Sequence, residues 1–590
     1  MPVHSGFGAL GLTKGELIMP PFEGKIFDYL VIGGGSAGCP LASRLSEDPT
    51  KQVLMLEAGE DFPPGEQPQD LDQAFVTSSK NNQRYVWGDL KAAFFPRPSN
   101  APDERPRRRY HQGKFIGGSS SVNGMCAVRG IPSDFEDWEA AGASGWGWEG
   151  VLPYYKKLEK DLDFGGPMHG DRGPIPLRRL PKEVWPGFTA AACRAFDAAG
   201  WPDLEDQNGR FEDGYFPIAM NNIDGKRISA AVGYLTTEVR GRPNFNLLDR
   251  THVRHLLFED RKVIGVAVTR DGQDFDLKAN EVILSTGALH SPALLMRSGI
   301  GPAEQLSLHG IETIVDRPGV GKNLQEHPGV NFGAWLKRRA RLRGDLPTHM
   351  IASLRYSSNF EGVPNGDMYI VPTNRAAWHS IGSQIGIMQL WVNRSYTRGE
   401  VKLASADPRD EPLVDFDMCS DRRDMERMIA GVKFMASVCE RPEFNDDVVE
   451  FFPVSYSPRA AKYGVYNTWQ AFETWVGSLL MDALPPARRW IIDNMISDGP
   501  TIQELASDET TCEQWIRKTV LGHWHASCSC KMGAAADPMA VTSPSGKVYG
   551  VDGLRVADAS IMPIVPCANT NLTSIMIGEK IADLVKSENI

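Results

Sequence analysis

The chain of 590 residues is longer than one hydrophobic core usually serves, so we expect several domains or a large two-lobed enzyme. Hydrophobic residues make up 42% and charged residues 23%, which are ordinary values for a folded, soluble protein. The net charge of −11, with one short basic run, argues against nucleic-acid binding. The 9 cysteines are few and odd in number, which indicates free thiols and favours the cytoplasm.

The N-terminal residues carry no targeting signal. Residues 1–24 have no apolar stretch behind a basic one, and no run of about 18 apolar residues occurs, so we expect neither secretion nor a membrane span. Regular patterning starts near Ile26, just after Met19. We therefore interpret residues 1–24 as a leader that is disordered or that precedes the true start.

The first strong elements are two apolar runs, 25–32 and 51–57, separated by a helix-favouring stretch. This β-turn-α-β pattern is typical of a dinucleotide-binding unit. Gly33, Gly35 and Gly38 form G-x-G-x-x-G at the turn. The first glycine turns tightly, the second lets the backbone approach a pyrophosphate, and the third lets the helix pack on the strand. Glu57 ends the second strand, where a carboxylate accepts the ribose hydroxyls.

The same loop also fits the G-x-S-x-G nucleophile elbow of α/β-hydrolases, with Ser36 as the nucleophile. That elbow normally follows several strands, because the nucleophile strand lies centrally in the sheet. Here it opens the fold, and Glu57 would have no role. We therefore prefer dinucleotide binding to hydrolysis.

Three later stretches have clear patterns. Residues 251–286 predict a hairpin that turns at Asp271-Gly272 and ends in a buried strand. Residues 421–438 have helical spacing. The Trp-rich segment 466–498 also has helix-like spacing, and we interpret it as packed against the rest of the protein. A subunit contact, a lid and membrane attachment are the alternatives, the last disfavoured because the segment is not basic.

Several longer stretches resemble one protein family. They are GKFIGGSSSVNGMCAVRG at 113–130, GALHSPALLMRSGIG at 287–301, GKRISAAVGYL at 225–235, PGVGKNLQEHP at 318–328 and GLRVADASIMPIVPCANTNLTSIMIGEKIADL at 553–584. The first two are similar to the two signatures of the glucose-methanol-choline (GMC) family of flavin oxidoreductases. With the glycine loop, the resemblance covers the chain to its last helix.

The resemblance implies an α/β fold in two parts. A Rossmann-like FAD-binding domain is assembled from discontinuous segments, and a substrate domain is built on an antiparallel sheet flanked by helices. The FAD-binding segments are expected at 25–135, with the flavin loop, at 221–330, and at 517–590, with the catalytic residues. The substrate-binding segments are expected at 136–220 and 331–516.

The resemblance also implies FAD as the cofactor. Glu57 is expected on the adenosine ribose, Val253 near the adenine, and the loop 117–124 along the pyrophosphate and isoalloxazine, unless that loop is merely flexible. Asp558 and Ala559 are expected beside the ribityl chain. His111 has no clear match to a flavin-tethering histidine, so we expect non-covalent FAD. The other expected contacts are Gly33, Gly35, Ser36, Ala37, Gly38, Gly118, Ser119, Asn123, Gly124, Trp524, Asn569 and Thr570.

Two residues match the family's catalytic pair. In GHWHASCSCKMG, 522–533, His525 corresponds to the base that takes the hydroxyl proton, and an ordinary imidazole is neutral near pH 7. Asn569 corresponds to the partner that holds the substrate oxygen, and it also suits a helix N-cap. A helix starting near Thr570 would direct its positive end at the flavin pyrimidine.

The neighbours of His525 are less specific. His523 points the same way in an extended segment, and three roles are open for it: second base, substrate contact or structural residue. Trp524 is expected to turn to the opposite side and to pack against the cofactor or a pocket wall. Cys528 and Cys530 fit neither a zinc site nor a C-x-x-C redox pair, so we expect buried small side chains and no metal.

We therefore predict an FAD-dependent alcohol oxidase or dehydrogenase that converts a primary alcohol to an aldehyde, with the proton taken by His525 and the hydride moved to flavin N5. The abundant Trp and Phe favour an aromatic or furanic alcohol; choline or an aliphatic alcohol is the alternative. Dioxygen or a quinone-type acceptor would take the electrons. A hydroxynitrile lyase or decarboxylase on the same fold is the other class, and either a monomer or a homodimer is expected.

Overall fold

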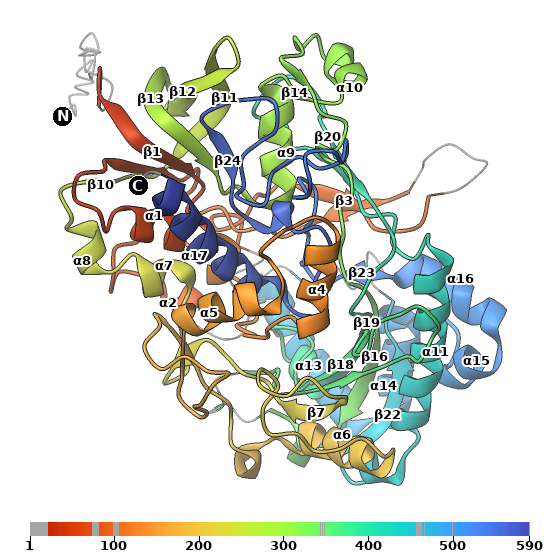
Figure 1. Cartoon of the computed structure of the whole chain (residues 1–590). Helices are drawn as coiled ribbons and strands as arrows, with labels where there is room; N and C mark the ends of the chain where they lie inside the picture. The colour runs from red at the N-terminus through yellow and green to blue at the C-terminus, as the bar shows by residue number, and fades with distance from the viewer. Residues whose placement is uncertain are drawn as a thin grey trace, which may run out of the picture.

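The computed structural model describes residues 22–72, 82–97, 105–342, 344, 346, 348–455, 463–464, 467–497 and 499–588. Residues 1–21 of the expected leader lie outside this set. Two large sheets organise the described chain, one in the upper and one in the lower part of Figure 1. Among the described residues, no helix has both the length and the apolarity needed to cross a bilayer.

The first sheet is built around the glycine loop. Its strands β1 (Ile26–Ile32) and β2 (Val53–Leu56) are parallel, and α1 (Gly38–Leu45) connects them, so the predicted β-turn-α-β unit is confirmed. Distant segments complete the sheet. In spatial order the strands are β10 (Phe245–Leu248), β2, β1, β13 (Gln273–Leu284), β12 (Lys262–Arg270) and β11 (Thr251–Glu259), with β24 (Leu554–Val556) paired to β13.

Strands β12 and β13 form the predicted hairpin. Asp271 and Gly272 have φ values of 49° and 78°, as a two-residue turn with both φ angles positive requires. Strand β13 then continues until it pairs in parallel with β1. One long strand therefore closes the hairpin and forms the centre of the nucleotide-binding sheet.

The second sheet is antiparallel throughout. Its order is β22 (Val448–Pro453), β16 (Pro328–Leu336), β19 (Ile385–Val392), β18 (Met368–Thr373), β17 (Ala352–Tyr356) and β7 (Gly214–Pro217), with β23 (Leu521–Gly522) paired to β16. Helices α6 (Gly187–Ala198) and α11 (Arg422–Cys439) share its apolar core. Helix α11 is the one predicted from 421–438, and Asp421 caps it by accepting a hydrogen bond from the Arg423 N–H. The predicted α/β fold class is confirmed; the limits of the FAD and substrate segments stay a prediction.

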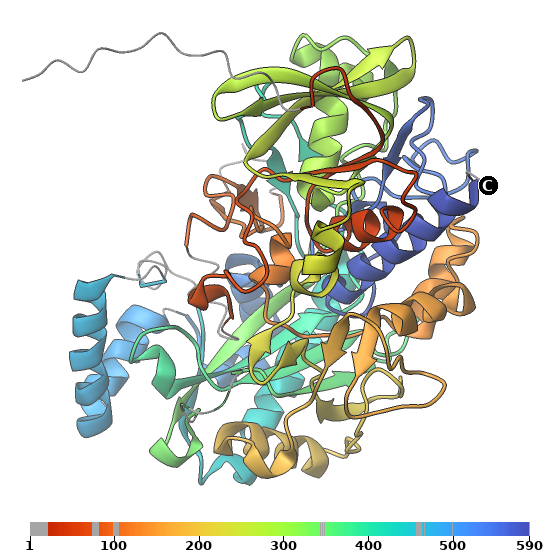
Figure 2. The ribbon, with the colours of Figure 1, turned by 90° about the vertical axis from the view of Figure 1, so that its left-hand side faces the viewer.

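The C-terminal segment connects the two sheets. Strand β23 belongs to the second sheet, β24 to the first, and α17 (Thr570–Glu588) packs along α1, as Figure 2 shows. Gly578 permits this approach, because a Cβ there would lie 2.3 Å from the Ala37 carbonyl oxygen. His525 and Asn569 both lie on this connecting segment, where the two sheets meet.

The Trp-rich segment differs from the expectation. Helices α13 (Thr468–Ala483) and α14 (Pro485–Ile491) leave Trp469, Trp475 and Trp490 each more than half exposed. The helical spacing was correct, but the interpretation that these side chains pack against the protein is wrong. Periodicity shows that a helix has an apolar face, not what covers it.

Candidate active site

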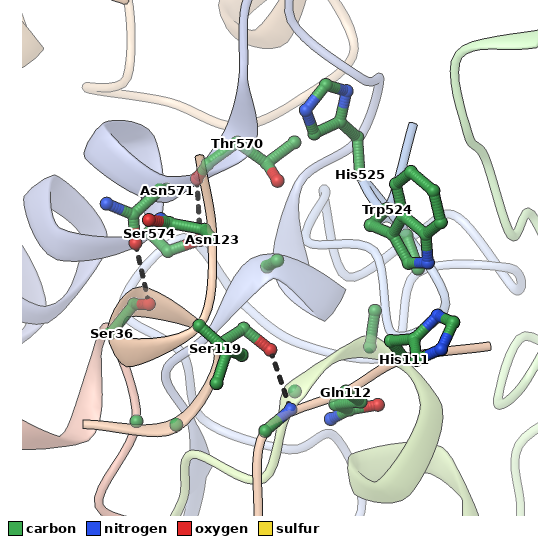
Figure 3. Close-up of a pocket in the computed structure, with 18 of the residues that line it drawn as sticks. Ser36, His111, Gln112, Ser119, Asn123, Trp524, His525, Thr570, Asn571 and Ser574 are labelled. Carbon is green, nitrogen blue, oxygen red and sulfur yellow. Dashed lines mark hydrogen bonds between the residues drawn. The ribbon is translucent and has the colours of Figure 1, made fainter. Parts of the chain in front are cut away.

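A cavity of about 510 Å³ is lined by residues of both sheets. It begins at the carboxyl ends of β1 and β2, at Ile32 and Leu56, and reaches the second sheet at Asn331 and Trp391. Figure 3 shows part of its lining. All the predicted site residues except Gly38 line it: Gly33, Gly35, Ser36, Ala37, Glu57, Gly118, Ser119, Asn123, Gly124, Val253, His523, Trp524, His525, Asp558, Ala559, Asn569 and Thr570.

The three glycines of the loop have different structural roles. A Cβ on Gly33 would lie 2.5 Å from the Ser285 carbonyl oxygen, and one on Gly38 would lie 2.0 Å from that of Gly33, so the protein itself requires both glycines. A Cβ on Gly35 would meet no protein atom closer than 4.0 Å, although Gly35 lines the cavity. The space above Gly35 is therefore open to a ligand, which fits the pyrophosphate of a dinucleotide.

The carboxylate of Glu57 is held in place by backbone donors. Its Oε2 accepts a hydrogen bond from the Gly34 N–H (2.9 Å) and its Oε1 accepts one from the Gly59 N–H (2.8 Å). Burial raises the pKa of Glu57. Because each carboxylate oxygen can accept a further bond, Glu57 can still accept ribose hydroxyls in the cavity.

The second loop is packed against the first. Residues Gly118–Ser121 form a short 3₁₀ helix, and the Gly117 N–H donates to the Gly34 carbonyl oxygen at 2.6 Å. A Cβ on Gly118 would lie 2.9 Å from the Gly35 Cα. The flexible-loop alternative is therefore wrong.

Ser36 and Asp558 contact elements that line the same cavity. The Ser36 hydroxyl donates a hydrogen bond to Oδ1 of Asn571, a residue of α17, at 2.8 Å. The nucleophile of a hydrolase would instead donate to a histidine. The nucleophile-elbow alternative is therefore wrong. Asp558 Oδ2 accepts bonds from the Gly287 N–H (2.9 Å) and the Ser291 hydroxyl (2.6 Å), on α9 (Gly287–Arg297).

His523 and His525 line the far end of the cavity, and the buried His327 lies behind His525. Burial lowers the pKa of His327 to about 3, that of His523 to about 4, and that of His525 well below its ordinary value. All three imidazoles are therefore neutral near pH 7. A neutral imidazole carries a hydrogen on one ring nitrogen only, so the partners determine which nitrogen that is.

The hydrogen-bond chain through His525 fixes its tautomer. His327 Nε2 lies 3.1 Å from the Pro566 carbonyl oxygen, which can only accept, so Nε2 carries the His327 proton. His327 Nδ1 is then an acceptor, and His525 Nδ1, 2.8 Å away, must donate to it. The remaining nitrogen, His525 Nε2, keeps its lone pair and faces the Asn569 amide nitrogen at 2.9 Å.

Glu326 holds the backbone of His327 and His525 in place. Its carboxylate accepts hydrogen bonds from the backbone N–H groups of His525 (2.8 and 2.9 Å) and His327 (2.8 Å), and from the Tyr110 hydroxyl (2.6 Å). Burial raises the pKa of Glu326 to about 7, but these partners are all donors, which favours the ionised, acceptor-only form. Glu326, His327 and His525 are also close enough to share a metal ion, but protein hydrogen bonds already use both carboxylate oxygens and both imidazole Nδ1 atoms.

His523 and Trp524 both line the cavity. The His523 ring packs against Trp391, with centroids 4.3 Å apart and the rings tilted by 37°, and its Nδ1 lies 3.3 Å from the His327 carbonyl oxygen. Trp524 lies in the cavity wall, and its φ of 61° interrupts the extended alternation from which its opposite orientation was predicted. Its ring lies 6.0 Å from that of His111, beside which Figure 3 shows it.

Some site residues had no assigned role in the sequence. Glu326 and His327 lie in the family-like stretch 318–328, so a signal existed, but their function depends on the pairing of β16 with β23, almost two hundred residues along the chain. Tyr110 gave no signal. Cys528 and Cys530 are buried and do not line the cavity, as expected.

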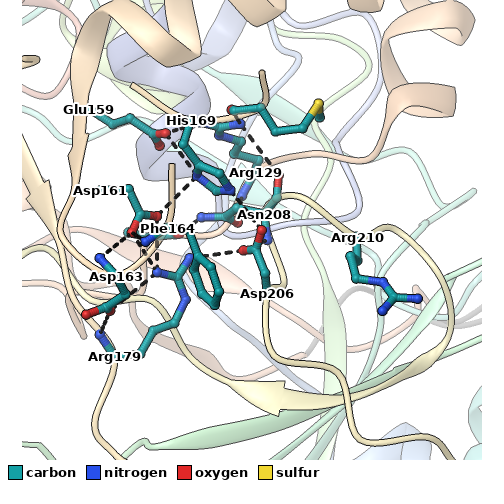
Figure 4. A network of polar contacts seen from close by, with 12 residues as sticks. Arg129, Glu159, Asp161, Asp163, Phe164, His169, Arg179, Asp206, Asn208 and Arg210 are labelled. Carbon is teal, nitrogen blue, oxygen red and sulfur yellow. Dashed lines mark hydrogen bonds and ion pairs between the residues drawn. The ribbon is translucent and has the colours of Figure 1, made fainter. Parts of the chain in front are cut away.

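A second polar cluster lies outside this cavity (Figure 4). His169 Nε2 lies 2.8 Å from Asp206, and its Nδ1 lies 3.2 Å from Asp161 and 3.4 Å from Glu159. Arg179 bridges Asp161 and Asp206, and Arg129 pairs with Glu159. Because carboxylates face both ring nitrogens, the pKa of His169 rises to about 10. The carboxylates, the two arginines and His169 therefore form a salt-bridge network.

These features define a class of protein. A nucleotide-binding sheet with a glycine loop, joined to an antiparallel sheet by a segment that carries a histidine–asparagine pair, is the arrangement of a flavin-dependent oxidoreductase.

The chain belongs to the GMC oxidoreductase family, whose models match residues 27–329 and 395–578. It is 39% identical to a 5-(hydroxymethyl)furfural oxidase of Methylovorus sp. (strain MP688), over 95% of this chain and 99% of that protein. It is 34% identical to an oxygen-dependent choline dehydrogenase of Rhizobium meliloti (strain 1021), over 94% and 95%. The structure of pyridoxine 4-oxidase from Mesorbium loti matches with a TM-score of 0.78 and 26% identity, over 95% and 99% of the two chains. The protein is therefore an FAD-dependent alcohol oxidase or dehydrogenase.

The open space above Gly35 generates the first prediction. Gly35→Ala should leave the stability of the apoprotein nearly unchanged, but weaken FAD binding by about tenfold or more, because the methyl group takes the space of the pyrophosphate. Flavin fluorescence titration and thermal unfolding of the apoprotein measure the two effects. Gly38→Ala is the control, since its Cβ meets the backbone and should lower the apoprotein Tm. Unchanged FAD affinity in Gly35→Ala would contradict this placement.

The His169 cluster generates a prediction about pH. Because the pKa of His169 is raised from 6.5 to about 10 in the folded protein, its ion pairs stabilise the fold fully below pH 6.5. This stabilisation is lost as the pH rises towards 10. His169→Gln should therefore lower the free energy of unfolding by about 3 kcal/mol near pH 6, with a smaller difference at higher pH. Denaturant unfolding at several pH values checks this, with His309→Gln as a control. A difference that is independent of pH would show that His169 is not charged.

Proposed function

We propose that this protein oxidises an aromatic or furanic primary alcohol to the aldehyde, with dioxygen as the final electron acceptor. Bound FAD supplies the acceptor for the hydride that leaves the alcohol carbon. The observation that carries the proposal is the lone pair inferred on His525 Nε2, 2.9 Å from the amide of Asn569 at the cavity wall. The names of relatives, an oxidase and an oxygen-dependent dehydrogenase, support dioxygen as the acceptor.

We assign FAD to the cavity by the residues that would hold it. Glu57 would bind the adenosine ribose and Val253 the adenine, while Gly35 and the loop 117–124 would leave room for the pyrophosphate. Asp558 and Ala559 would lie beside the ribityl chain, and the N-terminus of α17 at Thr570 beside the pyrimidine. Non-covalent attachment remains our proposal.

His525 and Asn569 would act on one substrate oxygen. An alcohol hydroxyl placed beside both groups, in exchange for the 2.9 Å hydrogen bond between them, can accept a hydrogen bond from Asn569 Nδ2 and donate its proton to His525 Nε2. The proton then stays on His525. His327 does not pass it on, because its own Nε2–H is bonded to the Pro566 carbonyl. His327 therefore orients the base, while Asn569 holds the oxygen as negative charge develops on it.

His523 and Trp524 would shape the substrate end of the cavity. The ring centroids of His523 and His525 are 6.3 Å apart, too far for direct proton exchange, and the contact of His523 with Trp391 fixes its place in the wall. We therefore propose a substrate-contacting role for His523 rather than a second base.

The cavity wall favours a neutral ring over choline. The second sheet contributes Tyr369, Val371, Ile387 and Trp391 to the lining. Among the described lining residues only Glu57 and Asp558 are acidic, and both are assigned to the cofactor. The lining also includes Arg375, whose charge would repel a quaternary ammonium group.

A panel of alcohols tests the function. Under anaerobic conditions, furfuryl and benzyl alcohols should bleach the flavin absorbance faster than choline does, and admitted oxygen should restore it with formation of peroxide. If no alcohol bleaches the flavin but cyanohydrins are cleaved, the protein is a lyase and the proposal is wrong. Reoxidation by quinones alone would contradict only the choice of acceptor.

His525→Ala tests the base in the same assay. Flavin reduction should slow by about a hundredfold or more, with an unchanged content of FAD. His309→Ala, remote from the cavity, should reduce at the rate of the parent protein. Because the pKa of His525 is lowered, kcat/KM of the parent protein should fall only as the pH drops below 6.5. A reduction rate unaffected by His525→Ala would contradict the assignment.

A further inference from the structure

Helix α13 has its polar side towards the protein and its apolar side towards solvent. Its buried residues are Thr474, Ser478 and Met481, and the two hydroxyls bond to carbonyls of the same helix. A surface helix of a monomeric protein normally has the opposite arrangement. We define the outer face as Trp469, Phe472, Trp475, Leu479 and Leu480 of α13 with Trp490 of α14, each at least 44% exposed.

The outer face is large enough for a stable contact. An aromatic side chain offers roughly 150–250 Å², so six large side chains about half exposed offer on the order of 700 Å². The largest apolar patch of a typical monomer covers about 300–600 Å². A specific interface buries about 800 Å² on each partner. The outer face therefore exceeds an ordinary surface patch and approaches one half of a standard interface.

The helix is fixed to the protein beneath it. Gln384 donates to the Ser478 carbonyl oxygen at 3.3 Å, and Arg341 pairs with Asp482 at 2.9 Å. Met481 is fully buried in a cluster with Trp335. Figure 2 shows α13 as a light-blue helix at the left-hand edge of the molecule. These contacts present the outer face rigidly, which does not suit a hinged lid.

Charge and spacing favour a second copy of the chain over a membrane. Helix α13 contains Glu473 and Asp482 but no Lys or Arg, and Arg488 and Arg489 of α14 are paired with Glu450. Helices that bind membrane surfaces are instead basic on their exposed side. The positions 469, 472, 475 and 479 form a stripe that can pack against the same stripe of another helix. In an antiparallel pair centred near residue 474, Trp469 of one copy would lie opposite Leu479 of the other, so the stripe is complementary to itself.

From these observations we infer that the outer face is the interface of a homodimer, in which the two α13 helices pack antiparallel about a twofold axis. The interface has a bearing on the site. Segment 375–384 lines the cavity at Arg375 and Ala376 and contacts α13 at Gln384. The partner would therefore brace a helix that supports one wall of the cavity.

Sedimentation velocity of the FAD-loaded protein at micromolar concentration tests the inference. The mass of the parent protein obtained from its sedimentation should be twice the chain mass of 65.0 kDa. Trp475→Glu combined with Leu479→Glu should yield monomers, with the dimer dissociation constant raised at least about tenfold. Both side chains are exposed, so the variant should fold, and its Tm and FAD content would be checked. Leu308→Glu is the matched control, since Leu308 is 77% exposed outside the outer face, and it should remain dimeric.

Other outcomes would overturn the inference. A parent protein that is monomeric at these concentrations contradicts it, whether or not the protein binds phosphatidylcholine vesicles. Vesicle binding that is lost in the double variant would identify a lipid surface as the true occupant. A dimer that survives both substitutions would place the interface elsewhere.

Discussion

The hydrogen bond between the imidazoles of His525 and His327 holds together the parts from which the site is built. His327 directly precedes β16 and His525 follows β23, so both rings stand at one end of the second sheet. Asn569 and Pro566, at the two ends of the hydrogen-bond chain, lie between β24 of the first sheet and α17. The chain of hydrogen bonds therefore passes between the two sheets twice, once from Pro566 to His327 and once from His525 to Asn569. Because the Pro566 carbonyl can only accept, it determines which nitrogen of His525 keeps its lone pair.

Burial has different consequences for the charged and the neutral groups of this site. It keeps the three imidazoles uncharged, so that the base is ready for a proton at neutral pH. Glu326 makes its contacts with backbone N–H groups and with Tyr110, so it positions the segment of His525 rather than pairing with its ring. The His169 cluster uses the opposite solution, in which carboxylates hold the imidazole in its charged form.

Local patterns in the sequence predicted much of the fold, and the family resemblance predicted part of the cavity lining. The β-turn-α-β unit and the Asp271-Gly272 hairpin depend on neighbouring residues, so spacing was sufficient for them. The role of His327 depends on strand pairing between distant segments, and the orientation of Trp524 on a positive φ, and neither leaves a local signal. Periodicity identified α13 as a helix, but it could not show that the aromatic face is turned outward.

Neutron diffraction from crystals of the deuterium-exchanged protein would test the central claim most directly, because it locates the hydrogens on the two imidazoles. The account predicts deuterium on His327 Nε2 and on His525 Nδ1, and none on His525 Nε2. Deuterium on His525 Nε2 would contradict it, because the nitrogen beside Asn569 would then be a donor and could not accept the proton of an alcohol.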